Sequence, residues 1–319
     1  MTNFQVYKKV LSFSLLMFVV NLLALAIMAG LTTAGFFIAN LGGVPLVGLL
    51  IGFILGIIAV VLINIFVVNR IKAAQIAMMV KGVTEGDLPE HTFKEGFNEI
   101  RGRFGRITAF FFVTNAIKGI FNQLGRGLNK IGTAVGGNTG NAVTSAIDSA
   151  VQTLIGYLCD CCLGWILFRK DTNVFRAGCE GAVIFFKHGK TLIRNIGRIF
   201  GMGFLSFLLI GGAFFGIFFL IFYQFPGMFE QLSAEIQAAG GADTPEFVYN
   251  ITLLTAFVSA FLGIMFWLAI HSVLIRPFIL VGVMRNFMAA GQADMPQESD
   301  IAELSSKSPR FARLAQRSE

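Results

Sequence analysis

The chain has 319 residues, of which 55% are apolar and only 13% are charged. A soluble domain carries about a quarter charged residues, so this composition excludes an ordinary soluble protein and indicates an integral membrane protein. The formal net charge is +7. The Lys and Arg residues lie in short stretches beside apolar runs, which points to loops kept in the cytoplasm and argues against a nucleic-acid partner.

Four apolar runs are long enough to cross a bilayer, which takes about 20 residues. They cover residues 11–38, 46–68, 199–222 and 251–275. Two further runs, 107–121 and 151–168, are shorter or interrupted by polar residues. Each of the two either crosses the bilayer or is buried among other helices. We predict an all-α transmembrane bundle of about six spans, and four spans remain if neither of these runs crosses.

The distribution of charge predicts the orientation of these spans. Lys and Arg are frequent in the segment 69–106 and in the tail 285–319, whereas the stretch 223–250 has neither and holds acidic residues. Basic loops stay on the cytoplasmic side of a membrane. We therefore predict that both termini are cytoplasmic, that 69–106 and 285–319 are cytoplasmic segments, and that the protein lies in the plasma membrane.

Two segments on the cytoplasmic side are predicted to contact the membrane surface. Segment 173–198 places its charged residues on one helical stripe, which predicts an amphipathic helix lying at the membrane interface. The stretch from Ser305 to Arg317 is basic, and its Phe311 and Leu314 are spaced to dip into an anionic leaflet. Anionic lipids at the cytoplasmic face are therefore predicted partners, together with the bilayer itself.

Glycines recur at a spacing of four in two of the apolar runs. Gly48, Gly52 and Gly56 form one ridge, and Gly212 and Gly216 form another. Such ridges let helix backbones approach closely in a membrane, where lipid supplies no hydrophobic drive for association. They indicate packing within the protein, with a homo-oligomer contact as the alternative.

Ionisable side chains in apolar segments are costly, which makes them the first candidates for a binding site. Asp160 has apolar neighbours and no basic residue within a helical turn, so it either binds a solute or reaches out to water. Glu180 follows Arg176 by four residues, a spacing that favours an ion pair between them. His271 near the end of the last run either contacts headgroups or relays protons.

Aromatic side chains close to these groups could surround an organic cation. Tyr157, Trp165 and Trp267 are the candidates for such cation–π contacts, although aromatic residues at span ends also anchor helices in the interface.

Asp160 itself lies within a cysteine cluster, residues 159–162, but neighbouring cysteines on a helix point in different directions. Palmitoylation or helix packing is therefore favoured over a metal site. No motif of a known enzyme class is present, so neither catalytic activity nor a cofactor is predicted.

Residues 158–199 read LCDCCLGWILFRKDTNVFRAGCEGAVIFFKHGKTLIRNIGRI. This stretch resembles the choline transporter-like family, in which a C-x-C-C-like run precedes a short helix and then an Arg-Asn pair that leads into a span. The matching residues are Cys159, Cys161, Cys162, Arg194 and Asn195. In layout, the resemblance extends over about residues 106–319, to the C-terminal half of that family. It implies a transporter-like helical core with a small organic cation, such as choline or a related amine, as cargo.

These observations lead to two hypotheses of function. The first is a transporter-like multi-pass protein whose candidate substrate-binding residues are Asp160, Tyr157, Trp165, Glu180, Trp267 and His271. The second is a non-transporting membrane scaffold or assembly subunit, which binds partners or anionic lipid on its cytoplasmic face. Polar side chains that converge at mid-membrane would favour the carrier, and a dry, sealed interior would favour the scaffold.

Overall fold

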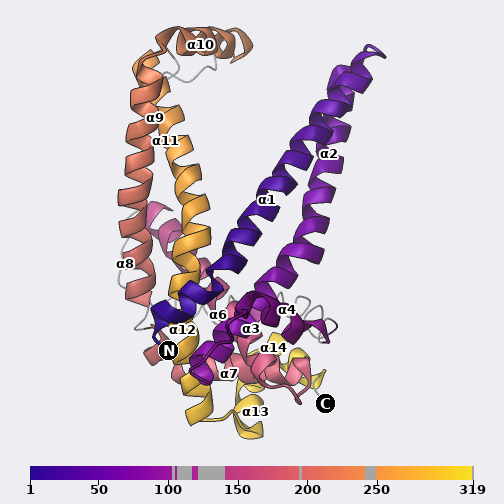
Figure 1. Ribbon diagram of the computed structural model, residues 1–319, viewed down its shortest axis with the longest axis vertical. Coiled ribbons are helices and arrows are strands. Elements are labelled where there is room, and N and C mark those ends of the chain that lie inside the picture. The colour runs from indigo at the N-terminus through magenta and orange to yellow at the C-terminus, as the bar shows by residue number, and fades with distance from the viewer. Residues whose placement is uncertain (103–104, 106–116, 121–140, 194–195, 241–248, 318–319) are drawn as a thin grey trace. The chain divides into compact units, whose positions relative to one another are not determined.

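The computed structural model describes residues 1–102, 105, 117–120, 141–193, 196–240 and 249–317 (Figure 1). All regular elements in these described ranges are helices, which confirms the predicted all-α class. The chain divides into two compact units, which are described separately below. Unit 1 comprises Met1–Ile196 and Pro277–Glu319, and unit 2 comprises Gly197–Arg276.

Unit 1 begins with a long helical hairpin. Helices α1 (Asn3–Asn40) and α2 (Pro45–Ile63) run side by side in opposite directions (Figure 1). The turn between them contains Gly43 in the left-handed region, at a φ of 74° that favours glycine. Apolar side chains cover the outside of this α1–α2 hairpin, with Leu23 58% and Ile54 55% exposed. Such a surface is suited to contact with lipid.

The first glycine ridge holds the two helices of this hairpin together. A Cβ atom on Gly48 would overlap the Gly35 carbonyl oxygen of α1, and one on Gly52 would overlap the Leu31 carbonyl oxygen. A Cβ atom on Gly56 would lie 2.7 Å from the Cγ atom of Met28. These glycines therefore pack within the protein, as small residues do where membrane helices approach closely.

Helix α2 continues without a loop into the rest of unit 1. A π-helical segment, η1 (Asn64–Val68), joins it to α3 (Asn69–Thr84). Residues of η1 are exposed or half-buried, whereas residues 73–80 of α3 are all buried. The junction thus marks the change from an apolar surface suited to lipid to the interior of a packed protein.

A cluster of shorter helices forms the remainder of unit 1, and we call it the helical body. It consists of the first turns of α1 together with α3, α4 (Thr92–Arg101), α6 (Asn141–Phe168), α7 (Val174–Ile193), α12 (Arg276–Ala293), α13 (Glu298–Lys307) and α14 (Pro309–Gln316). Val10 and Phe13 of α1 are fully buried in it, as are Trp165 of α6 and Phe287 of α12. Burial of such large side chains provides the main favourable term in its stability.

Unit 2 is a second apolar hairpin. Its elements are α8 (Ile196–Ser206), the π-helical segment η2 (Phe207–Gly211), α9 (Gly212–Tyr223), α10 (Pro226–Gly240), α11 (Ile251–Ile270) and the π-helical segment η5 (His271–Ile275). Helices α9 and α11 run side by side, and α10 lies across their far ends (Figure 1). The ring of Phe214 stacks on Phe266 at a centroid distance of 5.0 Å. Gly263 brings α11 against the backbone of Phe215.

Four helical stretches in the described residues are long and apolar enough to cross a membrane: Asn3–Asn40, Val47–Thr84, Gly201–Tyr223 and Ile251–Ala293. They coincide with the four runs predicted with least ambiguity, and the six-span count is not confirmed. Most of the run 107–121 lies outside the described residues. The run 151–168 forms the end of α6, and its residues from Leu158 to Leu167 are buried in the helical body. This run is apolar because it packs against other helices.

The two segments predicted to contact the membrane surface contribute to the helical body. Segment 173–198 corresponds largely to α7, of which residues 177–185 are buried in the helical body. Phe311 and Leu314 of α14 are 0% and 4% exposed, so the prediction that they dip into a leaflet is wrong. An apolar stripe on a helix predicts that this face is shielded from water, but not whether lipid or protein shields it. Here protein shields it.

Candidate functional site

Asp160 forms an ion pair that the sequence did not predict. Its carboxylate lies 2.5 Å from the Nζ atom of Lys72 on α3, and the Asp160 side chain is only 5% exposed. No basic residue lies within a helical turn of Asp160 along the chain. The packing of α3 against α6 supplies the partner, so this pair bridges two helices of the body.

We expect Asp160→Asn to lower the free energy of unfolding of unit 1 by about 2–3 kcal/mol, because it leaves the Lys72 ammonium half-buried without its counter-charge. The double substitution Lys72→Met with Asp160→Leu should recover much of this loss, since apolar pairs often replace buried ion pairs without cost. Thermal unfolding of the purified protein in detergent measures both effects. A double variant less stable than Asp160→Asn would contradict the expectation that apolar side chains can replace this pair.

Glu180 is the centre of a second ionic cluster in the body. Its carboxylate is 3% exposed, accepts a hydrogen bond from the indole Nε1 of Trp165 at 2.9 Å, and pairs with the Nε atom of Arg169 at 3.1 Å. The predicted pair with Arg176 is present at 3.7 Å, and Arg176 also pairs with Glu298 of α13. The Glu180 carboxylate is thereby neutralised by two guanidinium groups, and the indole of Trp165 is fully buried. These contacts bind α6, α7 and α13 together.

Further charged contacts attach the C-terminal helices to α7. The Nζ atom of Lys187 lies 2.9 Å from Asp294 and 3.4 Å from Asp300, and His188 lies 3.3 Å from Asp294. The hydrogen bond to Asp294 raises the pKa of Lys187. The backbone N–H of Gln297, with Lys187, lowers the pKa of Asp300, so both groups are charged at neutral pH.

The cysteine cluster lies inside the helical body. Cys159, Cys161, Cys162 and Cys179 are all buried and carry free thiols. Burial raises the pKa of Cys159 and of Cys179 to about 12, which leaves these thiols unreactive at neutral pH. Such thiols are closed to palmitoylation, and helix packing, the other predicted role, accounts for them. Among the described residues, no three His, Cys, Asp or Glu side chains converge to hold a metal ion.

Two predicted site residues meet in unit 2. The indole Nε1 of Trp267 donates a hydrogen bond to the Ser206 hydroxyl at 3.1 Å, and the Trp267 ring lies 5.3 Å from the His271 ring. Phe207 packs edge-on against Trp267. This cluster lies where η2 and η5 interrupt the α-helical pattern, and such π-helical turns are frequent at functional sites.

The six predicted site residues thus fall into several separate environments. Trp165 contacts Glu180, Trp267 contacts His271, and Asp160 pairs with Lys72. Tyr157 is 2% exposed in the core of the body. Lys72 and Arg169, with the acidic residues that pair with α7, are the groups that sequence reasoning missed. No local signal could have found them, because each lies more than two helical turns from its partner in the chain.

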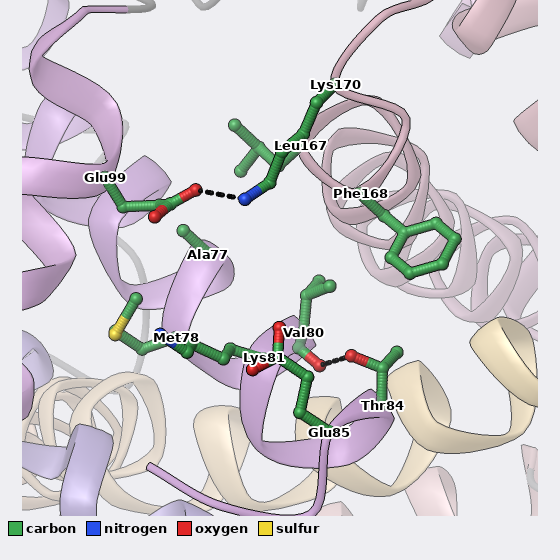
Figure 2. Close-up of a pocket in the computed structure, with 10 residues that line it drawn as sticks. All are labelled: Ala77, Met78, Val80, Lys81, Thr84, Glu85, Glu99, Leu167, Phe168 and Lys170. Carbon is green, nitrogen blue, oxygen red and sulfur yellow. Dashed lines mark hydrogen bonds and ion pairs between the residues drawn. The ribbon is translucent and has the colours of Figure 1, made fainter. Parts of the chain in front are cut away.

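Two clefts in the described part of the helical body are small. One lies between α3, α4 and the end of α6, has a volume of about 60 Å³, and is crossed by the ion pair between Glu99 and Lys170 (Figure 2). A second groove of about 210 Å³ lies between α7 and α13, and its charged lining residues are Lys187, Asp300, Glu303 and Lys307. Pockets for organic ligands usually measure about 300–1,000 Å³, so the first cleft has room only for water.

No family model matches the chain, and no curated protein and no solved structure is similar to it. The resemblance to the choline transporter-like family therefore stays a prediction.

Proposed function

We propose that the protein is a non-transporting membrane scaffold, in which the α1–α2 hairpin of unit 1 holds the helical body at the cytoplasmic face of the plasma membrane. The observation that carries this proposal is the use of the buried charges in the body. Asp160 is neutralised by Lys72, and Glu180 is neutralised by Arg169 and by a second arginine. A carboxylate that stabilises the fold in this way has little capacity left to compensate the charge of a solute.

Polar side chains in the apolar hairpins support the same conclusion. Thr32 donates its hydroxyl hydrogen bond to the carbonyl of Met28, and Ser259 donates to Thr255, each within its own helix. Asn64 likewise donates to the carbonyl four residues earlier. The hydrogen bonds of these three groups stay within one helix, which leaves the groups satisfied in an apolar environment.

The proposed orientation follows from the fold of unit 1 and from charge. The amino group of Met1 donates to the carbonyl of Gly86, and Arg285 donates to the carbonyl of Met1, so the start of the chain belongs to the helical body. Helices α13 and α14 belong to it as well. These contacts support the proposal that both ends of the chain share one side of the membrane, and the excess of Lys and Arg there favours the cytoplasmic side.

Reconstitution into proteoliposomes tests the proposal against transport. We expect uptake of labelled choline and related amines to equal that of protein-free vesicles for the wild-type chain and for Asp160→Asn. Saturable uptake by the wild-type protein would overturn the proposal. Loss of that uptake in Asp160→Asn, with folding verified by thermal unfolding, would place Asp160 in a transport path.

A scaffold should also contact other proteins through its body and not through its hairpins. A photo-crosslinking amino acid at the exposed Glu303 of α13 is expected to give discrete adducts in native cells. The same amino acid at the lipid-exposed Leu23 of α1 serves as the matched control and should give none. Equal yields at the two positions would contradict a partner-binding body.

A carrier of small organic cations is the second candidate, and the polar cluster of unit 2 favours it. Trp267 and His271 lie next to each other beside the π-helical segment η5, within an otherwise apolar hairpin. An indole face of this kind can bind a quaternary ammonium group. The same uptake assay with His271→Ala and Trp267→Leu decides this candidate, since a carrier would lose its saturable uptake in both variants.

A further inference from the structure

The C-terminal helix α14 has one face fixed to the body and another covered with arginine. Phe311 and Leu314 are buried, while Arg310, Arg313 and Arg317 are exposed. At about 100° per residue, the three arginines fall within a stripe of about 60° on the helix surface. We call this stripe the arginine face.

In the part of the chain that the structure describes, no carboxylate compensates the charge of the arginine face. Acidic residues elsewhere in the body pair with Lys or Arg, as Glu298 does with Arg176 and Glu303 with Lys307. Among the described residues, no carboxylate pairs with Arg310, Arg313 or Arg317, and α14 contains no acidic residue. Arg310 donates to the carbonyl of Gly119, which places the exposed Lys118 close to the same surface.

The arginine face is held in a fixed place by the packing of the helix behind it. The fully buried Ser308 caps α14, with its hydroxyl accepting a hydrogen bond from the backbone N–H of Phe311. Pro309 occupies the first turn, where its missing N–H is not needed. Because Phe311 and Leu314 are engaged with the body, α14 cannot offer them to a bilayer without unpacking.

We propose that the arginine face binds the phosphate headgroups of anionic lipids in the leaflet beside the helical body, by charge alone and without insertion of apolar side chains. The bilayer is the natural occupant, because the α1–α2 hairpin of the same unit keeps the body beside one, and its anionic leaflet complements a surface of guanidinium groups that no described carboxylate pairs with. This inference rests on the proposed cytoplasmic orientation of the body. It replaces insertion of Phe311 and Leu314 as the mode of lipid contact.

Fluorescence transfer from α14 to the lipid surface tests the proposal in the full chain. A dye on Gln316→Cys labels this exposed site selectively, because the native thiols are buried. The protein is placed in nanodiscs with an acceptor dye on the headgroups, with either about a third anionic lipid or only zwitterionic lipid. We expect higher transfer with anionic lipid and its loss in high salt, since surface charges are screened there.

The variant Arg313→Gln with Arg317→Gln should abolish the dependence on anionic lipid. Each basic residue near an anionic leaflet contributes about fivefold to binding, so two contribute about 25-fold. The charge-matched control Lys94→Gln with Arg101→Gln, on exposed residues of α4, should retain it. Fluorescence transfer that does not depend on lipid charge would overturn the proposal. Quenching of the dye by nitroxides deep in the acyl chains would also overturn it, because it would show insertion. Stronger binding of the arginine face to added RNA or acidic peptide than to lipid would overturn it as well.

Failure of the inference and failure of the proposed function can be told apart. An impermeant maleimide added to intact cells reacts with Gln316→Cys only if the body faces outward, which would remove the orientation on which both depend. If residue 316 is protected from the maleimide, and fluorescence transfer to the lipid does not depend on lipid charge, lipid binding by the arginine face is contradicted while the cytoplasmic orientation stands.

Discussion

Glu180→Gln should lower the free energy of unfolding of the helical body by about 3 kcal/mol, the largest effect expected of a single polar substitution in this protein. Glutamine keeps the size of the side chain but removes the charge that neutralises Arg169 and Arg176. Its amide nitrogen would also face donors wherever it replaces a carboxylate oxygen. For a unit of this length, about 3 kcal/mol corresponds to a fall of roughly 6–12 °C in the unfolding temperature.

The emission of Trp165 reports this change directly, because its indole donates to the Glu180 carboxylate. Glu303→Gln is the matched control, since that carboxylate is 65% exposed and its ion-pair partner among the described residues is the neighbouring Lys307. Exposed pairs of this kind contribute little to stability. Equal unfolding temperatures for Glu180→Gln and Glu303→Gln would show that the buried cluster does not stabilise the body.

Gly52→Ala should destabilise the α1–α2 hairpin, although alanine is normally the better helix former. Its Cβ atom would overlap the Leu31 carbonyl oxygen and lie 3.0 Å from the Cα atom of Thr32, so the two helices must move apart. Overpacking of a close contact costs about 1–3 kcal/mol. The measurement is the fraction of monodisperse protein that survives heating in detergent.

Gly212→Ala makes the same chemical change as Gly52→Ala, but we expect it not to destabilise the protein. No described atom lies within 4 Å of a Cβ added to Gly212, so only the gain in helix propensity remains, about 1 kcal/mol. We expect this variant to match or exceed the wild-type protein in heat resistance. If Gly52→Ala behaved in the same way, the close approach of α1 and α2 would not determine the stability of the hairpin.

Composition and the length of the apolar runs were sufficient to predict the class of the protein. The four least ambiguous runs became the four long apolar helices, since about 20 uncharged residues have few alternatives to a membrane span. The first glycine ridge likewise predicted a close helix contact, and Gly48 and Gly52 make it. These features depend on local spacing, which a sequence records directly.

The ion pairs of the body could not be predicted in the same way. Arg176 and Glu180 were paired correctly because they share one helix at a spacing of four, whereas Lys72 and Asp160 come from different helices. An apolar neighbourhood made Asp160 a predicted solute ligand, and the structure shows that this neighbourhood also surrounds its ion pair with Lys72.

The sequence by itself determined that the protein is helical and has helices long and apolar enough to cross a membrane, and it predicted that the basic residues lie on one side of that membrane. Only the tertiary structure decided which apolar faces are covered by protein and which are left for lipid. The run 151–168 and the stripe of Phe311 and Leu314 read like membrane contacts, yet both are buried in the helical body. The physical reason is that apolar surface leaves water equally readily for lipid and for a protein core. Hydrophobicity therefore predicts that a segment is shielded from water, but not whether lipid or protein shields it.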